Sequence, residues 1–570
     1  MTGSTNFLKE SLRACGSRLL IVIFFSFFIN MLMFVAPIHM LQIYDRVLVS
    51  RSDVTLLVLT LLAVGLLVIY GVLEGVRSKI LIRVGTKFDE LVGQRLFNLV
   101  FETAVRQPKL VPGQALRDMD TVRDFISGQA IIALCDAPWV PLFIAVGFFL
   151  HPLLGLVSVI GAVIIFILAL INELWTRRGL TEANTLTIQA ANELGSSLRN
   201  AEIVKALGMV GGVKKTWNQN HDGALTKQVS ASDRAAAVVA SSRFVRMALQ
   251  VIILAVGGYL AIQDEITPGV MIAASILMGR ALAPVEMAVA QWRNFIGVRT
   301  ALQRLNSLVD SQPESKELME LPAPRGFVSF ESVFARPPET GTLVLLNVSI
   351  QFEPGSFTAL VGPSGCGKSS LVRTLVGVWP AVRGTVRIDG ANIDNWSPER
   401  LGPHIGYMPQ DVELFNGTVA ENIARFQMID SPKVVEAAEK AGAHDLILKL
   451  PDGYDTNIGS QGQALSGGQR QMIALARAMY GDPQIIVLDE PNASLDGEGE
   501  KKLAGAIMTA KQSGATVVVV SHRPALLSIA DNIGVMNHGR VINFGPRDQI
   551  LNELKAGQPT APSQPTPANN

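Results

Sequence analysis

Long apolar segments and polar segments alternate through the first half of the chain, and this pattern predicts a membrane domain. A helix needs about 20 mainly apolar residues to cross the hydrocarbon core of a bilayer. Segments of this kind lie at residues 19–41, 54–76, 126–150, 153–174, 247–262 and 268–289. The fifth is the shortest, and we expect its helix to begin before the bilayer, within 235–242. We therefore predict a domain of six membrane-spanning helices.

Two long polar segments follow the second and the fourth apolar segment, and their charges predict the side on which they lie. Together they carry Arg77, Lys79, Arg83, Lys87, Arg95, Arg106, Arg177, Arg178, Arg199, Lys205, Lys214 and Lys215. The short connections at 151–152 and 263–267 contain no Lys or Arg. Because positive charge gathers on the cytoplasmic side of a membrane, we expect both long segments and both chain ends in the cytoplasm. Helical periodicity over 91–105 and 183–205 predicts that the helices continue beyond the bilayer, with tips that could contact another domain.

The third apolar segment contains the stretch ALCDAPWVPLF, residues 133–143, in which a carboxylate and two prolines interrupt the apolar pattern. A charge at membrane depth faces the protein interior or a cavity rather than lipid. Proline removes a backbone donor and bends or breaks a helix. We therefore predict a kinked third helix, with Asp136 facing inward and the bend shaping the cytoplasmic mouth of a pathway.

Other charged and aromatic residues of the membrane domain leave their roles open. Arg280 and Glu286 lie in the sixth apolar segment, and Arg243 and Arg246 lie where the fifth begins. They either line a transport pathway or form ion pairs. We expect Trp139 and Trp175 to lie at the membrane interfaces.

The composition agrees with a membrane protein and excludes some other classes. Apolar residues make up 49% of the chain and charged residues 17%, below the roughly 25% usual for soluble domains. The formal net charge of +1 gives no reason to expect a nucleic-acid partner. The three cysteines lack the spacing of a metal site or a disulfide framework, and we expect reduced thiols.

The second half begins with a change of composition after Asp310 and contains a phosphate-binding pattern. Strand-like residues 357–361 run directly into GPSGCGKSS, residues 362–370. This matches G-x-x-x-x-G-K-[ST] between a strand and a helix, where backbone N–H groups and a helix N-terminus face phosphate oxygens. We expect Lys368 to reach the β and γ phosphates and Ser369 to face Mg²⁺. The residues predicted to contact the nucleotide are Gly362, Pro363, Ser364, Gly365, Cys366, Gly367, Lys368, Ser369 and Ser370.

Two further motifs complete the chemistry. The apolar run 485–488 ends in Asp489 and Glu490, placed to hold Mg²⁺ through water and to act as a general base. Upstream, LSGGQ at 465–469 opens a predicted helix and forms a second anion site from Ser466, Gly467, Gly468 and Gln469.

These motifs together resemble the ATPase domain of an ABC transporter over residues 325–550. In that comparison 362–369 is the Walker A motif, 465–469 the signature and 485–490 the Walker B motif. Gln410 is similar to the Q-loop glutamine, Asp496 to the D-loop aspartate and His522 to the switch histidine. The resemblance implies ATP and Mg²⁺ as cofactors. It implies catalytic roles for Lys368, Gln410, Glu490 and His522, and metal binding by Ser369, Gln410 and Asp489.

The resemblance also implies a dimer, in which the signature and Asp496 of one chain face the ATP that Walker A of the other chain binds. In one respect the sequence departs from the family. The usual adenine-stacking aromatic is absent at 333–338, where Phe334 or Arg336 could replace it.

The layout resembles an ABC exporter half-transporter, and several segments resemble the type I secretion exporters of RTX-type proteases. These segments are 38–48, 114–128, 136–143 and 402–426. The expected fold class is a membrane α-helical six-span exporter domain joined to an α/β P-loop ABC ATPase domain. We expect an N-terminal cytoplasmic segment at 1–18, a transmembrane domain at 19–310, a linker at 311–324, a nucleotide-binding domain at 325–550 and a disordered tail at 551–570.

The resemblance implies ATP-driven export of an unfolded polypeptide with a C-terminal signal across the bacterial inner membrane. The implied partners are a second copy of the chain, a periplasmic adaptor (membrane fusion) protein, an outer-membrane channel of the TolC type, the secreted polypeptide and the lipid bilayer. Two alternatives stay open: an exporter of lipids or small molecules, and an ABC ATPase that acts as a channel or regulator. Intact Glu490 and His522 argue against the second.

Overall fold

The structure is a computed structural model of the chain, and it describes residues 7–106, 112–310, 321–338, 341–459, 462 and 464–556. The chain divides into two compact units. One comprises residues 1–104 and 109–315, and the other residues 105–108 and 316–570. Each unit is described by itself below.

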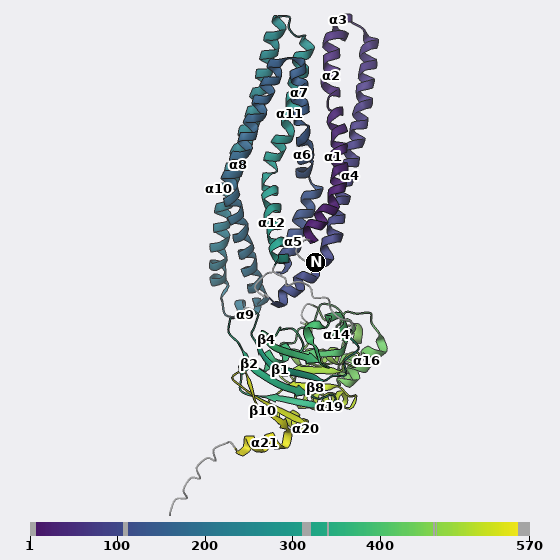
Figure 1. The fold of residues 1–570 in the computed structure, drawn as a ribbon, viewed down its shortest axis with the longest axis vertical. Helices are drawn as coiled ribbons and strands as arrows, with labels where there is room; N and C mark the ends of the chain where they lie inside the picture. Colours follow the sequence, from purple (N-terminus) through teal and green to yellow (C-terminus); the bar gives the residue numbers. More distant parts are fainter. Residues whose placement is uncertain are drawn as a thin grey trace, which may run out of the picture. The chain divides into compact units, whose positions relative to one another are not determined.

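The first unit is a bundle of long helices that run side by side (Figure 1). Six of its helical segments are long and apolar enough to cross a membrane, which confirms the predicted number of spans within the described residues. The α-helices of this unit are α1 (Phe7–Leu32), α2 (Val35–Gln42), α3 (Leu48–Ser50), α4 (Asp53–Arg106), α5 (Pro112–Ser127), α6 (Gln129–Asp136), α7 (Val140–Leu150), α8 (Pro152–Arg199), α9 (Ala201–Ala206), α10 (Val210–Ile262), α11 (Pro268–Ala290) and α12 (Trp292–Asp310). Between them lie the π-helix η1 (Ile43–Val47) and the 3₁₀ turn η2 (Ala137–Trp139).

The helices extend far beyond the predicted apolar segments, because their polar continuations also pack. On α8 and α10 the buried residues beyond the apolar runs are small and recur at intervals of seven. They are Ala183 and Ala190 on α8, and Ala224, Ala231 and Val238 on α10. A seven-residue repeat of buried positions keeps one helix face against its neighbour, as in a coiled coil. The two helices accordingly lie side by side along their length (Figure 1).

The first predicted span is interrupted, a feature that the apolar pattern alone did not predict, although Pro37 cannot donate a hydrogen bond to the carbonyl of Met33, four residues before it. A turn at Met33 and Phe34 separates α1 from α2, and the helix then widens into η1. Within η1, Asp45 accepts a hydrogen bond from the backbone N–H of Gly269 at 2.9 Å. The carboxylate therefore ties the end of the first span to the start of α11.

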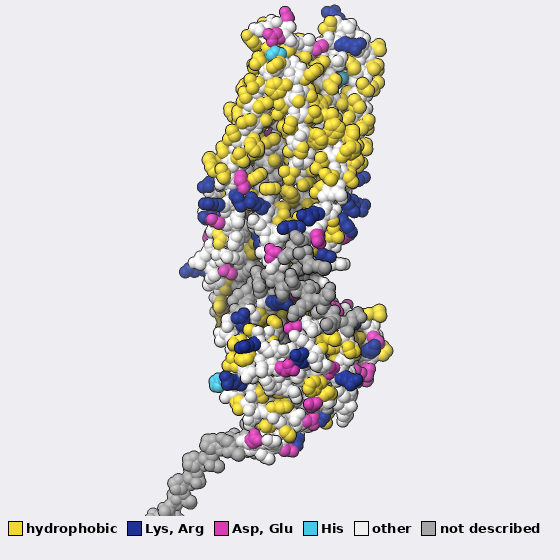
Figure 2. Space-filling view, in the orientation of Figure 1, with side chains coloured by type: hydrophobic (Ala, Val, Ile, Leu, Met, Phe, Trp, Pro, Cys, Tyr) yellow, Lys and Arg dark blue, Asp and Glu magenta, His cyan; other side chains and the backbone are white. Residues whose placement is uncertain are grey.

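Side chains on the outside of the helices are mostly apolar over one continuous band (Figure 2). Leu20, Phe24 and Leu61, for example, are 67%, 60% and 64% exposed. Large apolar side chains in such numbers cannot face water without cost, and a lipid environment removes that cost. Lys and Arg side chains gather below the band (Figure 2).

Asp136 faces the protein interior, as predicted, and lies in a buried polar network. The guanidinium of Arg77, itself 2% exposed, donates to the Asp136 carboxylate at 2.7 Å and to the Ser26 hydroxyl at 3.0 Å. The Asn30 amide donates to the same carboxylate oxygen at 3.0 Å. Glu74 completes the network with an ion pair to Arg77 at 2.6 Å. The network joins three membrane segments, α1, α4 and α6.

The third span is interrupted where the sequence predicted a kink. Helix α6 ends at Asp136, the 3₁₀ turn η2 contains Pro138, and α7 begins at Val140 with Pro141 in its first turn. Trp139 of this turn packs against Phe27 with ring centroids 5.0 Å apart. Its position as an interfacial anchor, and the role of the interruption in shaping a pathway, stay predictions.

The charges of the fifth and sixth spans resolve in part into ion pairs. Glu286 accepts from Arg246 at 2.9 Å and lies 4.0 Å from Arg243. The ion-pair alternative therefore describes Glu286. Arg280 is exposed and has no carboxylate partner among the described residues, so a position on the pathway stays a prediction for it.

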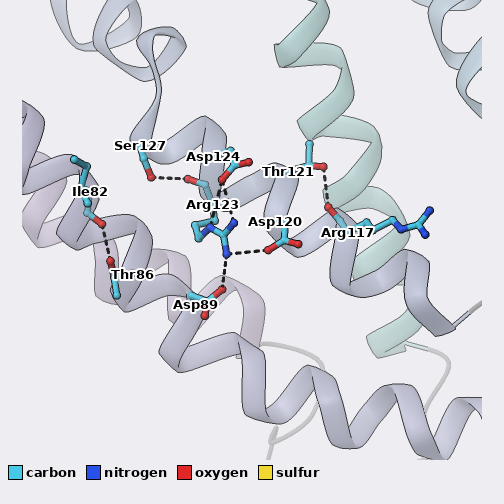
Figure 3. Close-up of polar contacts among 9 residues, drawn as sticks. All are labelled: Ile82, Thr86, Asp89, Arg117, Asp120, Thr121, Arg123, Asp124 and Ser127. Carbon is cyan, nitrogen blue, oxygen red and sulfur yellow. Dashed lines mark hydrogen bonds and ion pairs between the residues drawn. The ribbon is translucent and has the colours of Figure 1, made fainter. Parts of the chain in front are cut away.

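A second, more exposed arginine joins α5 to α4 (Figure 3). Arg123 of α5 points toward Asp89 of α4, at 3.3 Å, and toward Asp120 and Asp124 of its own helix, at 2.8 and 3.2 Å. Its side chain is 37% exposed, against 2% for Arg77. The two arginines therefore allow an exposed ion-pair cluster to be compared with a buried one.

The second unit contains two sheets. A six-stranded sheet has the order β10-β9-β3-β8-β7-β6 and is parallel except for β10, and a four-stranded antiparallel sheet has the order β2-β1-β4-β5. The strands are β1 (Val328–Ala335), β2 (Leu345–Phe352), β3 (Phe357–Val361), β4 (Arg383–Ile388), β5 (Ala391–Asn392), β6 (Ile405–Met408), β7 (Ile485–Asp489), β8 (Thr516–Val520), β9 (Asn532–Asn537) and β10 (Arg540–Pro546). The strand predicted at 357–361 is confirmed as β3, the apolar run 485–488 forms β7, and His522 follows the strand β8.

The helices of this unit are short apart from two. They are α13 (Lys368–Leu375), α14 (Pro398–Leu401), α15 (Val419–Ile423), α16 (Ser431–Lys440), α17 (His444–Leu448), α18 (Gly467–Met479), α19 (Gly497–Gln512), α20 (Pro524–Ile529) and α21 (Arg547–Ala556). Helix α21 continues past residue 550, so the tail predicted at 551–570 starts too early. The rest of that tail, from 557, lies outside the described residues.

One half-buried arginine holds the helical part of this unit to the sheet. The guanidinium of Arg425 donates to the carbonyls of Gly402 and Ile405, at 2.8 and 3.1 Å. It also donates to those of Arg477 and Ala478 in α18, at 3.0 and 3.2 Å. Burial lowers the pKa of Arg425 to about 10, and the neighbouring charge of Arg477 acts in the same direction. The arginine thus links the signature helix to the start of β6.

We predict that breaking the buried network destabilises the membrane unit more than breaking the exposed one. Asp136→Asn leaves Arg77 with Glu74 as its one remaining counter-charge among the described residues, and loss of one partner of a buried pair costs about 3–5 kcal/mol. Arg123→Gln should cost less than about 1 kcal/mol, because exposed ion pairs are weak. The measurement is the temperature at which half of the detergent-purified protein loses its monodisperse peak in size-exclusion chromatography.

A double replacement provides the control. Arg77→Met combined with Asp136→Leu removes both charges, and should recover much of the stability that Asp136→Asn loses. Equal losses for Asp136→Asn and Arg123→Gln would contradict the assignment of the network as buried.

Candidate nucleotide-binding site

The site is built at the carboxyl edge of the parallel strands. Strand β3 ends at Val361, and α13 begins at Lys368, as the motif predicted. The loop between them needs glycine because three of its residues have positive φ: 151° at Gly362, 77° at Gly365 and 106° at Gly367. A β-carbon on Gly362 would also overlap the carbonyl oxygen of Met536. Only glycine therefore combines this backbone turn with this close approach.

Lys368 curls back over the loop that precedes it. Its ammonium donates to the carbonyls of Gly362 and Pro363, at 2.7 and 3.0 Å, and the residue is 6% exposed. A buried ammonium held by two carbonyls places fixed positive charge at the loop. Together with the N-terminus of α13 it favours an anionic ligand such as phosphate.

Not every residue of the loop can present its side chain to a ligand. Pro363, Ser364 and Gly365 are exposed, whereas the thiol of Cys366 is packed in the apolar core and the residue is 5% exposed. The Cys366 carbonyl accepts a hydrogen bond from Gly539 at 2.9 Å. Cys366 therefore serves the loop through its packing and its backbone, and Ser370, also buried, does so as well.

Asp489, at the end of β7, is a buried carboxylate without a hydrogen bond in the described structure. It is 1% exposed, and neither oxygen has a partner among the described residues. Burial raises the pKa of Asp489, while the nearby Ser369 hydroxyl and the charges of Arg373 and Lys368 act in the opposite direction. Such an orphaned carboxylate beside a hydroxyl fits a hard cation that prefers oxygen ligands.

Glu490 and Gln410 are brought into direct contact. The Gln410 amide donates to the Glu490 carboxylate at 3.0 Å. Gln410 follows β6, which pairs in parallel with β7, so both side chains emerge at the same edge of the sheet. Glu490 has a φ of 50°, a left-handed conformation that is unfavourable for glutamate. Its backbone N–H is held by the Val520 carbonyl at 3.0 Å.

His522 follows β8, the next strand of the same sheet, and is exposed. Within the part of the chain that the structure describes, its side chain has no hydrogen bond. The preceding Ser521 is anchored, because its hydroxyl donates to the Asn492 amide oxygen at 3.2 Å. The structure thus places His522 at the correct edge without bringing it against Glu490, and its catalytic role stays a prediction.

The signature residues form a second, separate group. Ser466 caps α18 through a reciprocal pair: its hydroxyl accepts from the Gln469 backbone at 3.2 Å, and the Gln469 side chain accepts from the Ser466 backbone at 2.8 Å. Asp496 caps α19 through a single hydrogen bond, which its side chain accepts from the backbone N–H of Gly499 at 2.8 Å. Both caps line one hollow of about 590 Å³. None of the described residues that line it belongs to 362–370.

Sequence reasoning missed one residue near the site. Arg373 of α13 lies over the ring of Trp379, with its Cζ atom 5.1 Å from the centroid, and its charge acts on Asp489. The sequence did contain a signal for it, namely a basic residue in the last turn of α13, the helix that follows the phosphate-binding loop. Of the two predicted substitutes for the adenine-stacking aromatic, Phe334 is half-buried in β1 and Arg336 is exposed. That function stays a prediction for both.

Comparison with known proteins agrees with this arrangement. The family model for the ABC transporter transmembrane region matches residues 19–284, and the model for the ABC transporter matches residues 345–493. The type I secretion system ATP-binding protein PrsD of Rhizobium meliloti (strain 1021) is 42% identical over 549 residues, 95% of this chain and 94% of that protein. The leukotoxin translocation ATP-binding protein LktB of Mannheimia haemolytica is 30% identical over 537 residues, 92% of this chain and 75% of that protein.

A solved structure shares the fold over both units. The chain is similar to a bacterial Atm1-family ABC exporter with ATP bound, with a TM-score of 0.83 over 96% of this chain and 99% of that one. The sequence identity is 22%, so this likeness concerns the fold.

We predict that Gly362→Ala destabilises the second unit and that Gly365→Ala does so much less. Both replacements strain a positive φ, at a cost of roughly 1–2 kcal/mol. Only the first adds a clash, with the Met536 carbonyl, whereas nothing lies within 4 Å of a β-carbon at Gly365. Thermal unfolding without nucleotide, followed by intrinsic fluorescence, compares the two variants. Similar midpoints for both variants would show that the close approach at Gly362 is unimportant.

Proposed function

Because the chain belongs to the type I secretion ATP-binding proteins of the ABC transporter family, we propose that it uses ATP hydrolysis to export an unfolded polypeptide across the bacterial inner membrane. The observation that carries this proposal is the similarity to PrsD over 95% of the chain, combined with the presence of every residue predicted for the triphosphate chemistry. The ATPase domain would lie in the cytoplasm, as the positions of the basic residues predict.

Each residue of the site has a role that its position supports. Lys368 and the backbone of 362–370 bind and orient the phosphates. Ser369, Asp489 and Gln410 would hold Mg²⁺, which neutralises phosphate charge when it is bound. Glu490, held by Gln410 at 3.0 Å, accepts a proton from the attacking water. His522 would complete the site from the end of β8.

The separation of the two groups supports a homodimer. Ser466 and Asp496 line a hollow that contains none of the described P-loop residues. Both would serve the nucleotide bound by a second copy, with the N-terminus of α18 facing its phosphates. ATP binding would then draw two chains together.

The membrane domain would receive this motion through the tip between α8 and α10. Its apolar residues Ile203, Leu207 and Val210 are 55%, 70% and 59% exposed, which suits a contact with another domain. The tip of the other long polar segment, around 107–111, lies outside the described residues.

The proposed substrate is an RTX-type protease or a related protein with a C-terminal signal. The proposed partners are a periplasmic adaptor protein and a TolC-type outer-membrane channel. The names of two relatives, one for type I secretion and one for leukotoxin translocation, support a polypeptide over the alternative of a lipid or small molecule.

We predict that Glu490→Gln lowers the rate of ATP hydrolysis by a factor of about 10² to 10⁴, because it removes the general base. Binding of ATP should persist, since Lys368 and the P-loop are unchanged. Phosphate release by the purified chain and fluorescence of a trinitrophenyl-ATP probe measure the two properties. Glu399→Gln, at an exposed glutamate of α14, is the matched control and should hydrolyse at the normal rate. An unchanged rate in Glu490→Gln would exclude this residue as the base.

The class of substrate is tested by export. In cells that also express an adaptor and a channel, we expect a reporter carrying an RTX-type C-terminal signal to reach the medium. Secretion should stop with Glu490→Gln and persist with Glu399→Gln. Proteoliposomes containing the chain and a fluorescent lipid provide the opposing measurement. ATP-dependent lipid movement without secretion of the reporter would favour the alternative function.

A further inference from the structure

Four basic side chains gather where the apolar surface of α1 and α4 ends. Lys79, Arg83 and Lys87 recur at every fourth residue of α4 and therefore share one face of that helix. Arg18 of α1 belongs to the same group, because it and Lys87 both act electrostatically on Glu90. We call these four residues the basic cluster.

The depth of the cluster follows from the packing of the two helices. Cys15 of α1 contacts the carbonyl of Val84 at 4.0 Å, and Ser26 accepts from Arg77 at 3.0 Å. Arg18, which lies between these two contacts, is therefore level with the stretch of α4 that runs from 77 to 84. All four cations consequently lie within a few turns of one another, on the side of the long polar segments.

Three of the four cations in the cluster lack a counter-charge among the described residues. Lys87 pairs with Glu90 at 2.9 Å. In the described ranges, Arg18, Lys79 and Arg83 have neither a hydrogen bond nor a carboxylate partner for their side chains, and all three are exposed. Arg77, two residues before Lys79 on the same helix, by contrast pairs with two carboxylates. Three unpaired cations at the edge of an apolar surface favour an anionic ligand.

The surface next to the cluster indicates what kind of anion the cluster can bind. Ile82 precedes Arg83 on α4, and Ile21 and Phe24 lie three and six residues after Arg18 on α1. Their side chains are 55%, 48% and 60% exposed. Lys and Arg side chains lie at the lower edge of the apolar band (Figure 2). A ligand that covers both surfaces must carry acyl chains and a negative headgroup. An acidic polypeptide would satisfy the cations but leave the apolar side chains uncovered.

We propose that the basic cluster is a binding site for the headgroup of an anionic phospholipid in the cytoplasmic leaflet. Arg18, Lys79 and Arg83 donate to the phosphate oxygens, and the acyl chains lie along Ile21 and Phe24 of α1 and Ile82 of α4. Lipid recognition by clustered cations at a membrane edge is electrostatic and weakens as salt rises. This inference requires only that α1 and α4 lie in the bilayer, and it is independent of what the protein exports.

The test uses full-length protein that has been depleted of lipid in a neutral detergent. Phosphatidylglycerol is titrated in, and the thermal midpoint is recorded, with phosphatidylcholine, inorganic phosphate and polyglutamate as separate additions. Phosphatidylglycerol should raise the midpoint, and the other three should have little effect. The triple variant Arg18→Gln, Lys79→Gln, Arg83→Gln should need about tenfold more phosphatidylglycerol or more for half of the effect.

The control variant makes the same change of charge elsewhere. Arg383→Gln, Lys449→Gln and Arg540→Gln replace three exposed cations of the second unit, and this variant should respond to phosphatidylglycerol as the natural protein does. Mass spectrometry of co-purified lipid gives a second readout that does not depend on stability. An unchanged response of the cluster variant would overturn the proposal, as would equal stabilisation by inorganic phosphate or by polyglutamate.

Discussion

The ion pair between Arg77 and Asp136 is the interaction on which the first half of the membrane bundle depends. A bilayer core offers no water, so each charge must find its partner within the protein. Here one guanidinium, 2% exposed, meets two carboxylates and a hydroxyl that come from three different segments. Because the network spans α1, α4 and α6, none of these helices can rotate or slide without exposing a charge. The apolar contacts around it carry no such directional requirement.

The same stretch of α4 serves two opposite environments. Arg77 turns toward the bundle interior, while Lys79 and Arg83 turn outward. A helix advances 100° per residue, so cations only two positions apart can face the core and the membrane edge. Charges at this level therefore fix the rotation of α4 about its axis. It is costly to bury an unpaired Lys79 or Arg83 in the bundle, and it is unfavourable to withdraw these side chains from the membrane interface.

Local patterns in the sequence predicted most of the spans and the strands beside the site motifs. They did not predict contacts between residues that are far apart in the sequence. The spans, the strands beside GPSGCGKSS and the strand that ends at Asp489 all follow from neighbouring residues. The break at Met33 and Phe34 was missed because the prediction used the apolar pattern alone, whereas Pro37, four residues after Met33, was an available signal. Gln410 and Glu490 were each predicted from motifs, yet their contact depends on the pairing of β6 with β7. The sequence did not predict the role of Arg425, because its four partners are backbone carbonyls, which every residue has.

Glu490 occupies a backbone position that suits a different residue. Its φ of 50° is one that glycine and asparagine adopt readily, whereas glutamate does so at a cost of about 1–2 kcal/mol. Replacement by glycine would therefore relax the turn and stabilise the folded domain while removing the carboxylate. A lineage under selection for stability alone would lose glutamate at this position. The proposed role of this carboxylate as the general base would explain why glutamate is present at a position that its backbone conformation disfavours.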